Sequence, residues 1–113
     1  MVSNTTTGGR EGLSRHGEEA GGLSGRPLFA PSTAMLAELA KALDGQLPII
    51  GVGGVGNADD AYMKIVKGAS LVQLYTALVF KGPDLVWDIV RGLDERLAID
   101  GFDGVQPAIG AAL

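Results

Sequence analysis

The feature that most constrains the fold is a pair of short apolar runs, each of which ends in glycine or polar residues and leads into a helical pattern. The first, residues 47–54, ends in a glycine-rich tip, and the second, residues 70–76, ends in Tyr75 and Thr76. Continuous apolar runs of this length are typical of strands that a parallel sheet buries on both faces. Strands that alternate with helices indicate βαβ units. The sequence therefore predicts an α/β fold with parallel pairing.

Helical patterns surround the two apolar runs. Residues 32–44 carry apolar side chains at three- and four-residue spacing, with Ser32 or Thr33 as a cap. The third and longest predicted helix opens with Pro83 at its first position. Its buried stripe is expected to consist of Val86, Ile89, Val90, Leu93 and Leu97.

The helix between the two strands has the clearest end signals. Residues 58–67 follow Asn57, a plausible N-cap, and carry acidic residues in the first turn and Lys64 near the last, which matches the helix dipole. The chain is thus expected to contain about two complete parallel strands and three helices. Two such strands do not close a sheet, so further strands must pair with their edges or the edges stay open.

Length and composition suit a piece of a larger barrel. The chain has 113 residues, far below the ~250 of a typical (β/α)₈ barrel. Hydrophobic residues make up 46% and charged residues 19%, as expected for a part of a larger, more buried structure. The net charge of −4 and the scattered lysines and arginines argue against nucleic-acid binding. With no cysteine, there is no thiolate nucleophile and no cysteine-based metal site. No apolar run approaches the ~18 residues of a membrane span.

The two strand ends are candidates for a phosphate site. At the first, Gly51-Val52-Gly53-Gly54 lacks bulky side chains, so a phosphate could approach backbone N–H groups. At the second, the N–H groups of Tyr75 and Thr76 and the Thr76 hydroxyl could complete the same cup. Each motif alone has a simpler explanation, a tight turn for the glycines and a half-buried strand end for the Tyr-Thr pair. Together they favour a phosphate site.

Earlier motifs are weaker when taken alone. Gly21-Gly22-Leu23-Ser24-Gly25 could let backbone touch a cofactor or could be a linker. Asn4-Thr5-Thr6 could recognise a planar polar substrate or could be an ordinary polar terminus. His16, the only histidine, lies among charged residues and is expected to be solvated rather than a catalytic base.

Four segments in this order resemble the class 2, quinone-dependent dihydroorotate dehydrogenases. They are residues 3–6, 21–28, 47–55 and 68–83. Each motif is common, but the combination is highly specific. The resemblance implies that residues 1–113 form the C-terminal portion, an incomplete domain, of an FMN-binding (β/α)₈ TIM barrel.

The resemblance also implies roles for individual residues. Asn4 and Thr5 would bind the orotate ring and carboxylate. The family's catalytic serine base and flavin-contacting lysine lie upstream of the matched segments, so no catalytic residue and no metal ligand is assigned here. Residues expected to line FMN are Ser3, where the family usually has threonine, and Gly25, Gly54, Tyr75 and Thr76, the last three around the phosphate.

The implied activity is oxidation of dihydroorotate to orotate through FMN, with electrons passed to a quinone, in de novo pyrimidine (UMP) biosynthesis. Such enzymes are peripheral proteins of the inner or cell membrane, bound through N-terminal helices that this chain lacks. Without the serine base, the chain alone is expected to be inactive. One alternative is a non-catalytic barrel fragment or remnant that binds FMN or phosphate. The other is a flavin or phosphate barrel of a different reaction class, which the combined motifs disfavour.

Overall fold

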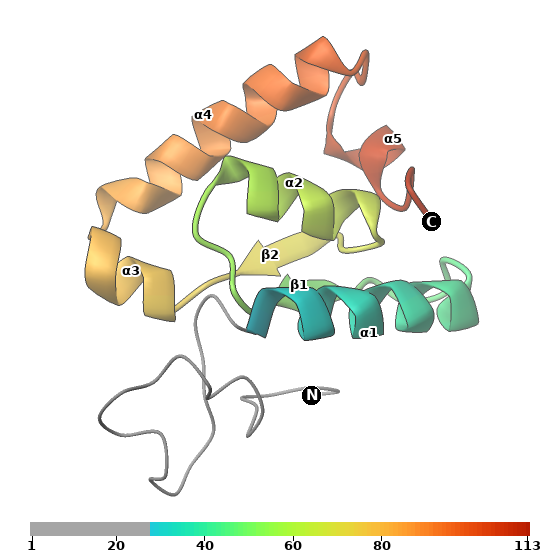
Figure 1. The fold of residues 1–113 in the computed structure, drawn as a ribbon. Coiled ribbons are helices and arrows are strands. Elements are labelled where there is room, and N and C mark those ends of the chain that lie inside the picture. The colour runs from blue at the N-terminus through green and yellow to red at the C-terminus, as the bar shows by residue number, and fades with distance from the viewer. Residues whose placement is uncertain (1–27) are drawn as a thin grey trace, which may run out of the picture.

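The computed structural model describes residues 28–113 and shows a two-stranded parallel sheet with helices packed against it (Figure 1). The two strands pair in register, with Gly51 opposite Val72, so the predicted α/β fold and parallel pairing are confirmed. The elements in chain order are α1 (Phe29–Leu43), β1 (Ile50–Val52), α2 (Ala58–Val66), β2 (Leu71–Gln73), α3 (Thr76–Lys81), α4 (Asp84–Ile99) and α5 (Val105–Ala108).

Helix α2 forms as its end signals predict. The Asn57 side chain caps the helix by accepting a hydrogen bond of 2.8 Å from the backbone N–H of Asp60. The side chain of an N-cap asparagine satisfies one of the N–H groups that the first turn leaves without an acceptor. Beyond the C-cap Lys67, Gly68 has a φ of +119° and turns the chain toward β2.

Helix α1 begins earlier than predicted, at Phe29, and neither Ser32 nor Thr33 caps it. Pro31 lies in the first turn, where a missing N–H costs nothing because that group has no acceptor within the helix. The hydroxyl groups of Ser32 and Thr33 are instead buried and point into the protein. The cap prediction was wrong because these side chains serve a tertiary contact with α2.

Residues 28–113 contain five helices, where three were predicted. The six-residue α3 was missed because residues 77–80 are apolar and follow the strand run closely, with no turn signal such as glycine or proline between them, and α5 has only four residues. Gly82, with a φ of +85°, separates α3 from α4. Pro83 is the N-cap of α4 rather than its first helical residue.

The sheet is covered on one face only within the described residues, which contradicts the prediction of strands buried on both faces. Gly51 is buried, and a Cβ built on it would lie 2.9 Å from the Cβ of Ala69 and 3.2 Å from that of Lys64. Ile50 and its partner Leu71 are 55% and 64% exposed. A pair of strands alternates its side chains between two faces, and only the Gly51 face meets helices α1 and α2.

The core lies mainly between α2 and α4, the two helices with the most extensive mutual packing (Figure 1). The predicted stripe of α4 is correct for Ile89 and Leu97, which are buried, and wrong for Val86 and Val90, which are exposed. Leu85 is buried in their place. Both sets recur at four-residue spacing on neighbouring faces of the helix, so periodicity alone could not decide which one meets α2.

Candidate site at the strand ends

The structure brings the two predicted phosphate motifs to the same edge of the sheet. The last residues of the strands, Val52 and Gln73, are register partners, so the segments that follow them start side by side. A Cβ built on Gly56, in the loop after β1, would lie 3.9 Å from the Cβ of Ala77 in the first turn of α3. The loop of residues 53–56 and the beginning of α3 are therefore neighbours.

Gly53 and Gly54 are required by the packing of the loop against α1. Both have positive φ, +115° and +72°, a conformation that favours glycine. A Cβ on Gly54 would approach the Cβ of Phe29 to 2.4 Å and its backbone nitrogen to 2.5 Å, and one on Gly53 would approach the Oγ of Ser32 to 2.5 Å. The two glycines thus allow α1 to approach the loop closely, which explains why a tight glycine turn stands here.

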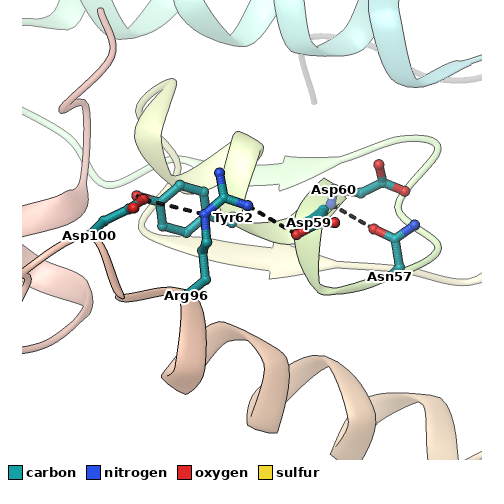
Figure 2. A network of polar contacts seen from close by, with 6 residues as sticks. All are labelled: Asn57, Asp59, Asp60, Tyr62, Arg96 and Asp100. Carbon is teal, nitrogen blue, oxygen red and sulfur yellow. Dashed lines mark hydrogen bonds and ion pairs between the residues drawn. The ribbon is translucent and has the colours of Figure 1, made fainter. Parts of the chain in front are cut away.

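The N-terminus of α2 is already occupied by the protein's own side chains. The backbone N–H of Gly56 donates to Oδ2 of Asp60 at 3.1 Å. The N–H of Asp60 donates to the Asn57 side chain, as Figure 2 shows. Asp60 is buried at 5% exposure. A carboxylate in this position competes with any anion that approaches the start of α2.

The beginning of α3 is different, because within the described residues no side chain caps it. Tyr75 is its N-cap and makes no capping hydrogen bond, and the first turn holds no acidic residue. N–H groups in the first turn of a helix have no acceptor inside that helix, and such helix starts commonly bind anions in proteins. Thr76 is the first residue of the helix, and the Tyr75 side chain is 76% exposed.

Lys81 adds a cation beside the loop. Its Nζ donates to the carbonyl oxygen of Gly56 at 2.6 Å and lies at the exposed surface. Lys81 was not predicted from the sequence, because its position near the loop depends on α3, the helix that was missed. Predicting Lys81 as a site residue would have required predicting the six-residue helix between β2 and Gly82.

Lys64 is fully buried, with 0% exposure, between the loop and α1. Its Nζ donates to the hydroxyls of Ser32 and Thr33 at 2.6 and 2.8 Å and lies 4.9 Å from the centre of the Phe29 ring. Burial lowers the pKa of Lys64 from 10.5 to about 8, with the charge of Asp60 acting in the opposite direction. The sequence pattern indicated only a favourable charge near the end of α2.

A second polar network joins α2 to the C-terminal part of α4 (Figure 2). The Tyr62 hydroxyl donates to Asp100, and Arg96 donates to Asp100 at 3.3 Å and to Asp59 at 3.1 Å, with its guanidinium 4.6 Å from the centre of the Tyr62 ring. The shared hydrogen bond raises the pKa of Tyr62 and lowers that of Asp100. This network stabilises helix packing and contacts no part of the strand-end loops.

Other site predictions fall outside what the structure shows. Ser3, Asn4, Thr5 and Gly25 lie outside the described residues. Within residues 28–113 there is no cluster of histidine, cysteine, aspartate or glutamate side chains that could hold a metal ion. None of the helices in this range is both long and apolar enough to cross a membrane.

Comparison with known proteins gives the family. Residues 1–97 match the family model described as dihydroorotate dehydrogenase. Over 98% of its length, the chain is 55% identical to a dihydroorotate dehydrogenase (quinone) from Parvibaculum lavamentivorans, covering 32% of that relative. It is 49% identical to the mitochondrial dihydroorotate dehydrogenase (quinone) of Oryza sativa subsp. japonica, covering 98% of this chain and 24% of that relative.

The fold agrees with this relationship. The crystal structure of ligand-free DHODH from Eimeria tenella superimposes with a TM-score of 0.91 at 41% identity, over 98% of this chain and 31% of that one. The chain therefore has the fold of part of a dihydroorotate dehydrogenase barrel and spans about a third of the length of the bacterial relatives it matches. Sequence and structure together show that the chain belongs to the dihydroorotate dehydrogenase family.

Proposed function

We propose that this chain forms the C-terminal portion of a quinone-dependent dihydroorotate dehydrogenase, which oxidises dihydroorotate to orotate in pyrimidine biosynthesis. The supporting observation is that relatives about 50–55% identical over nearly the whole chain carry that name. The family is flavin-dependent, and we propose FMN as the flavin. Because the chain matches about a third of those relatives, the catalytic base and the membrane-binding helices would come from the remaining two thirds.

The observation that carries the cofactor proposal is the meeting of the glycine loop after β1 with the start of α3 after β2. Barrel enzymes frequently bind phosphate at the loops after the last two strands and at the N-terminus of a short extra helix. The six-residue α3 directly follows β2 and fits that description. Gly54, Tyr75 and Thr76 would hold the FMN phosphate there, with Lys81 as a nearby cation.

The donor set fits a phosphate better than it fits a neutral group. Backbone N–H groups at the start of α3 supply donors, and Lys81 supplies positive charge. The carboxylate of Asp60 is held by the Gly56 N–H, on the side that caps α2. When bound, the flavin would carry the hydride, while the protein anchors and orients it.

The substrate side of the proposal rests on the family resemblance. Asn4 and Thr5 would bind dihydroorotate and orotate, and Ser3 and Gly25 would contact the flavin. The electron acceptor would be a quinone, reached through the N-terminal region of the full-length enzyme, which would sit at the membrane surface as a peripheral protein.

A chimeric enzyme tests the activity. The full-length Parvibaculum lavamentivorans relative aligns with this chain over 113 residues, and those residues are replaced by the present sequence. We expect the purified chimera to contain FMN and to reduce a quinone with dihydroorotate. As a control, the same chimera with Gly54→Val should lose flavin. A folded, flavin-loaded chimera that does not form orotate would contradict the proposed function.

A further inference from the structure

A buried lysine ties the glycine loop to α1, and neither the activity nor the cofactor proposal accounts for it. Lys64 has no exposed surface, yet its charged group lies within hydrogen-bonding distance of two hydroxyls. We infer that Lys64 is a positioning residue, which holds the Gly53–Gly54 loop in the conformation that binds the cofactor phosphate. This inference rests on the proposed function for the identity of the ligand.

The contact to Gly53 passes through one hydroxyl. Ser32 Oγ accepts from Lys64 at 2.6 Å and lies 3.2 Å from the carbonyl oxygen of Gly53 and 3.1 Å from that of Phe29. A serine hydroxyl has one proton to donate and lone pairs to accept with. Because the ammonium can only donate, it occupies a lone pair and leaves the single proton for a carbonyl. The lysine therefore keeps Ser32 Oγ as a donor that the carbonyl oxygens of Phe29 and Gly53 share.

The contact to Gly54 passes through Phe29. The Lys64 ammonium lies 4.9 Å from the centre of the Phe29 ring, a distance at which a cation attracts an aromatic face. The backbone of the same residue presses against Gly54, where a built Cβ would lie 2.5 Å from the Phe29 Cα. Lys64 thus holds both α1 residues that contact the two glycines.

The second hydroxyl provides an internal control. Thr33 accepts from Lys64 at 2.8 Å, and no hydrogen bond leads from it to the loop. If Lys64 only stabilised α1, loss of Ser32 and loss of Thr33 would have similar effects. If Lys64 positions the loop, loss of Ser32 should disturb the loop more than loss of Thr33.

The test compares amide hydrogen exchange in the 113-residue chain and in Lys64→Met, which removes the charge at similar length. Lys67→Met, at the C-cap of the same helix, is the matched control, since its Nζ donates to the carbonyl oxygen of Ala112 at the exposed surface. We expect Lys64→Met to speed exchange in peptides covering residues 50–57 while those of α4 stay unchanged. Faster exchange of equal size in residues 50–57 and in α4, or no faster exchange in residues 50–57 than in Lys67→Met, would overturn the inference.

Ser32→Ala and Thr33→Val keep the inference testable if Lys64→Met does not fold. We expect Ser32→Ala to speed amide exchange in residues 50–57 and Thr33→Val to leave exchange there as in the unmodified chain. Equal effects of the two variants on the loop would overturn the inference.

Cofactor binding supplies a second readout, with riboflavin as the probe that lacks the phosphate. We expect Lys64→Met to weaken FMN binding about 10-fold, equivalent to about 1.4 kcal/mol, and to leave riboflavin binding unchanged. If the unmodified chain binds no FMN, the proposed cofactor site fails, and exchange in residues 50–57 still decides the role of Lys64. If FMN binds and Lys64→Met alters neither FMN affinity nor loop exchange, the inference fails and the proposed function stands.

Discussion

Raising the pH above 8 is expected to stabilise this chain through Lys64. Its pKa is about 8 in the folded protein, against 10.5 ordinarily. Between these values the unfolded chain binds more protons than the folded one, so the free energy of unfolding rises with pH. At about 1.4 kcal/mol per pH unit, the full gain across this range is at most about 3.5 kcal/mol. Below pH 8 the cost of burying the charge is fully present, and above pH 10.5 it is absent.

Urea unfolding of the chain and of Lys64→Met, measured from pH 7 to 10, isolates this contribution. The groups that face the ammonium are Asp60, whose charge favours protonation, and the neutral side chains of Ser32, Thr33 and Phe29. The unmodified chain is expected to gain stability relative to Lys64→Met as pH rises. Parallel pH profiles for the two proteins would refute the account of Lys64 as a buried cation.

Three further outcomes are expected. Gly54→Ala should lower the melting temperature far more than Gly45→Ala, because both glycines have positive φ but only the first would clash with α1; equal losses would refute the close approach. Asn57→Ala should cost about 1 kcal/mol in urea unfolding through loss of the α2 cap. Tyr62→Phe should raise the Asp100 pKa, which carboxyl NMR measures. The lowered pKa of Asp100 stabilises the fold above the ordinary carboxyl pKa, and this contribution is lost as the pH falls through the folded-state value, so it should be smaller in the variant.

The alternation of strands and helices was predictable because each element carried its own local signals. Helix α2 formed as expected, since a capping asparagine and acidic residues in the first turn decide its start locally. The pairing of the two apolar runs followed from βαβ connectivity. These signals depend on neighbours in the sequence, which is why sequence reasoning could use them.

Features that depend on distant contacts were missed or misassigned. Ser32 and Thr33 have the chemistry of helix caps. They are buried within α1 because their hydroxyls accept hydrogen bonds from Lys64 of α2, a contact that the local sequence does not indicate. Val86 and Leu85 are equally apolar, and the packing direction of α4 decides which of them is buried. Sequence periodicity cannot supply that direction.

The candidate site was predictable in part. Gly54 and Tyr75 lie at strand ends that the parallel register brings together, as the sequence suggested. The short helix α3 was hidden because a strand-like apolar run continues into it, and Lys81 was hidden with it. The close approach of Phe29 to Gly54 was also out of reach, because it joins a helix start to a loop that is remote in sequence.

The most direct test of the central claim is a titration of the ¹⁵N-labelled chain with FMN and, separately, with riboflavin, followed by amide NMR. If the two strand ends form the phosphate site, FMN should shift the amide signals of Gly54, Thr76 and Ala77, and riboflavin at the same concentration should leave them in place. Equal shifts with riboflavin, or FMN-induced shifts confined to other segments, would contradict the assignment of these strand ends to the cofactor phosphate.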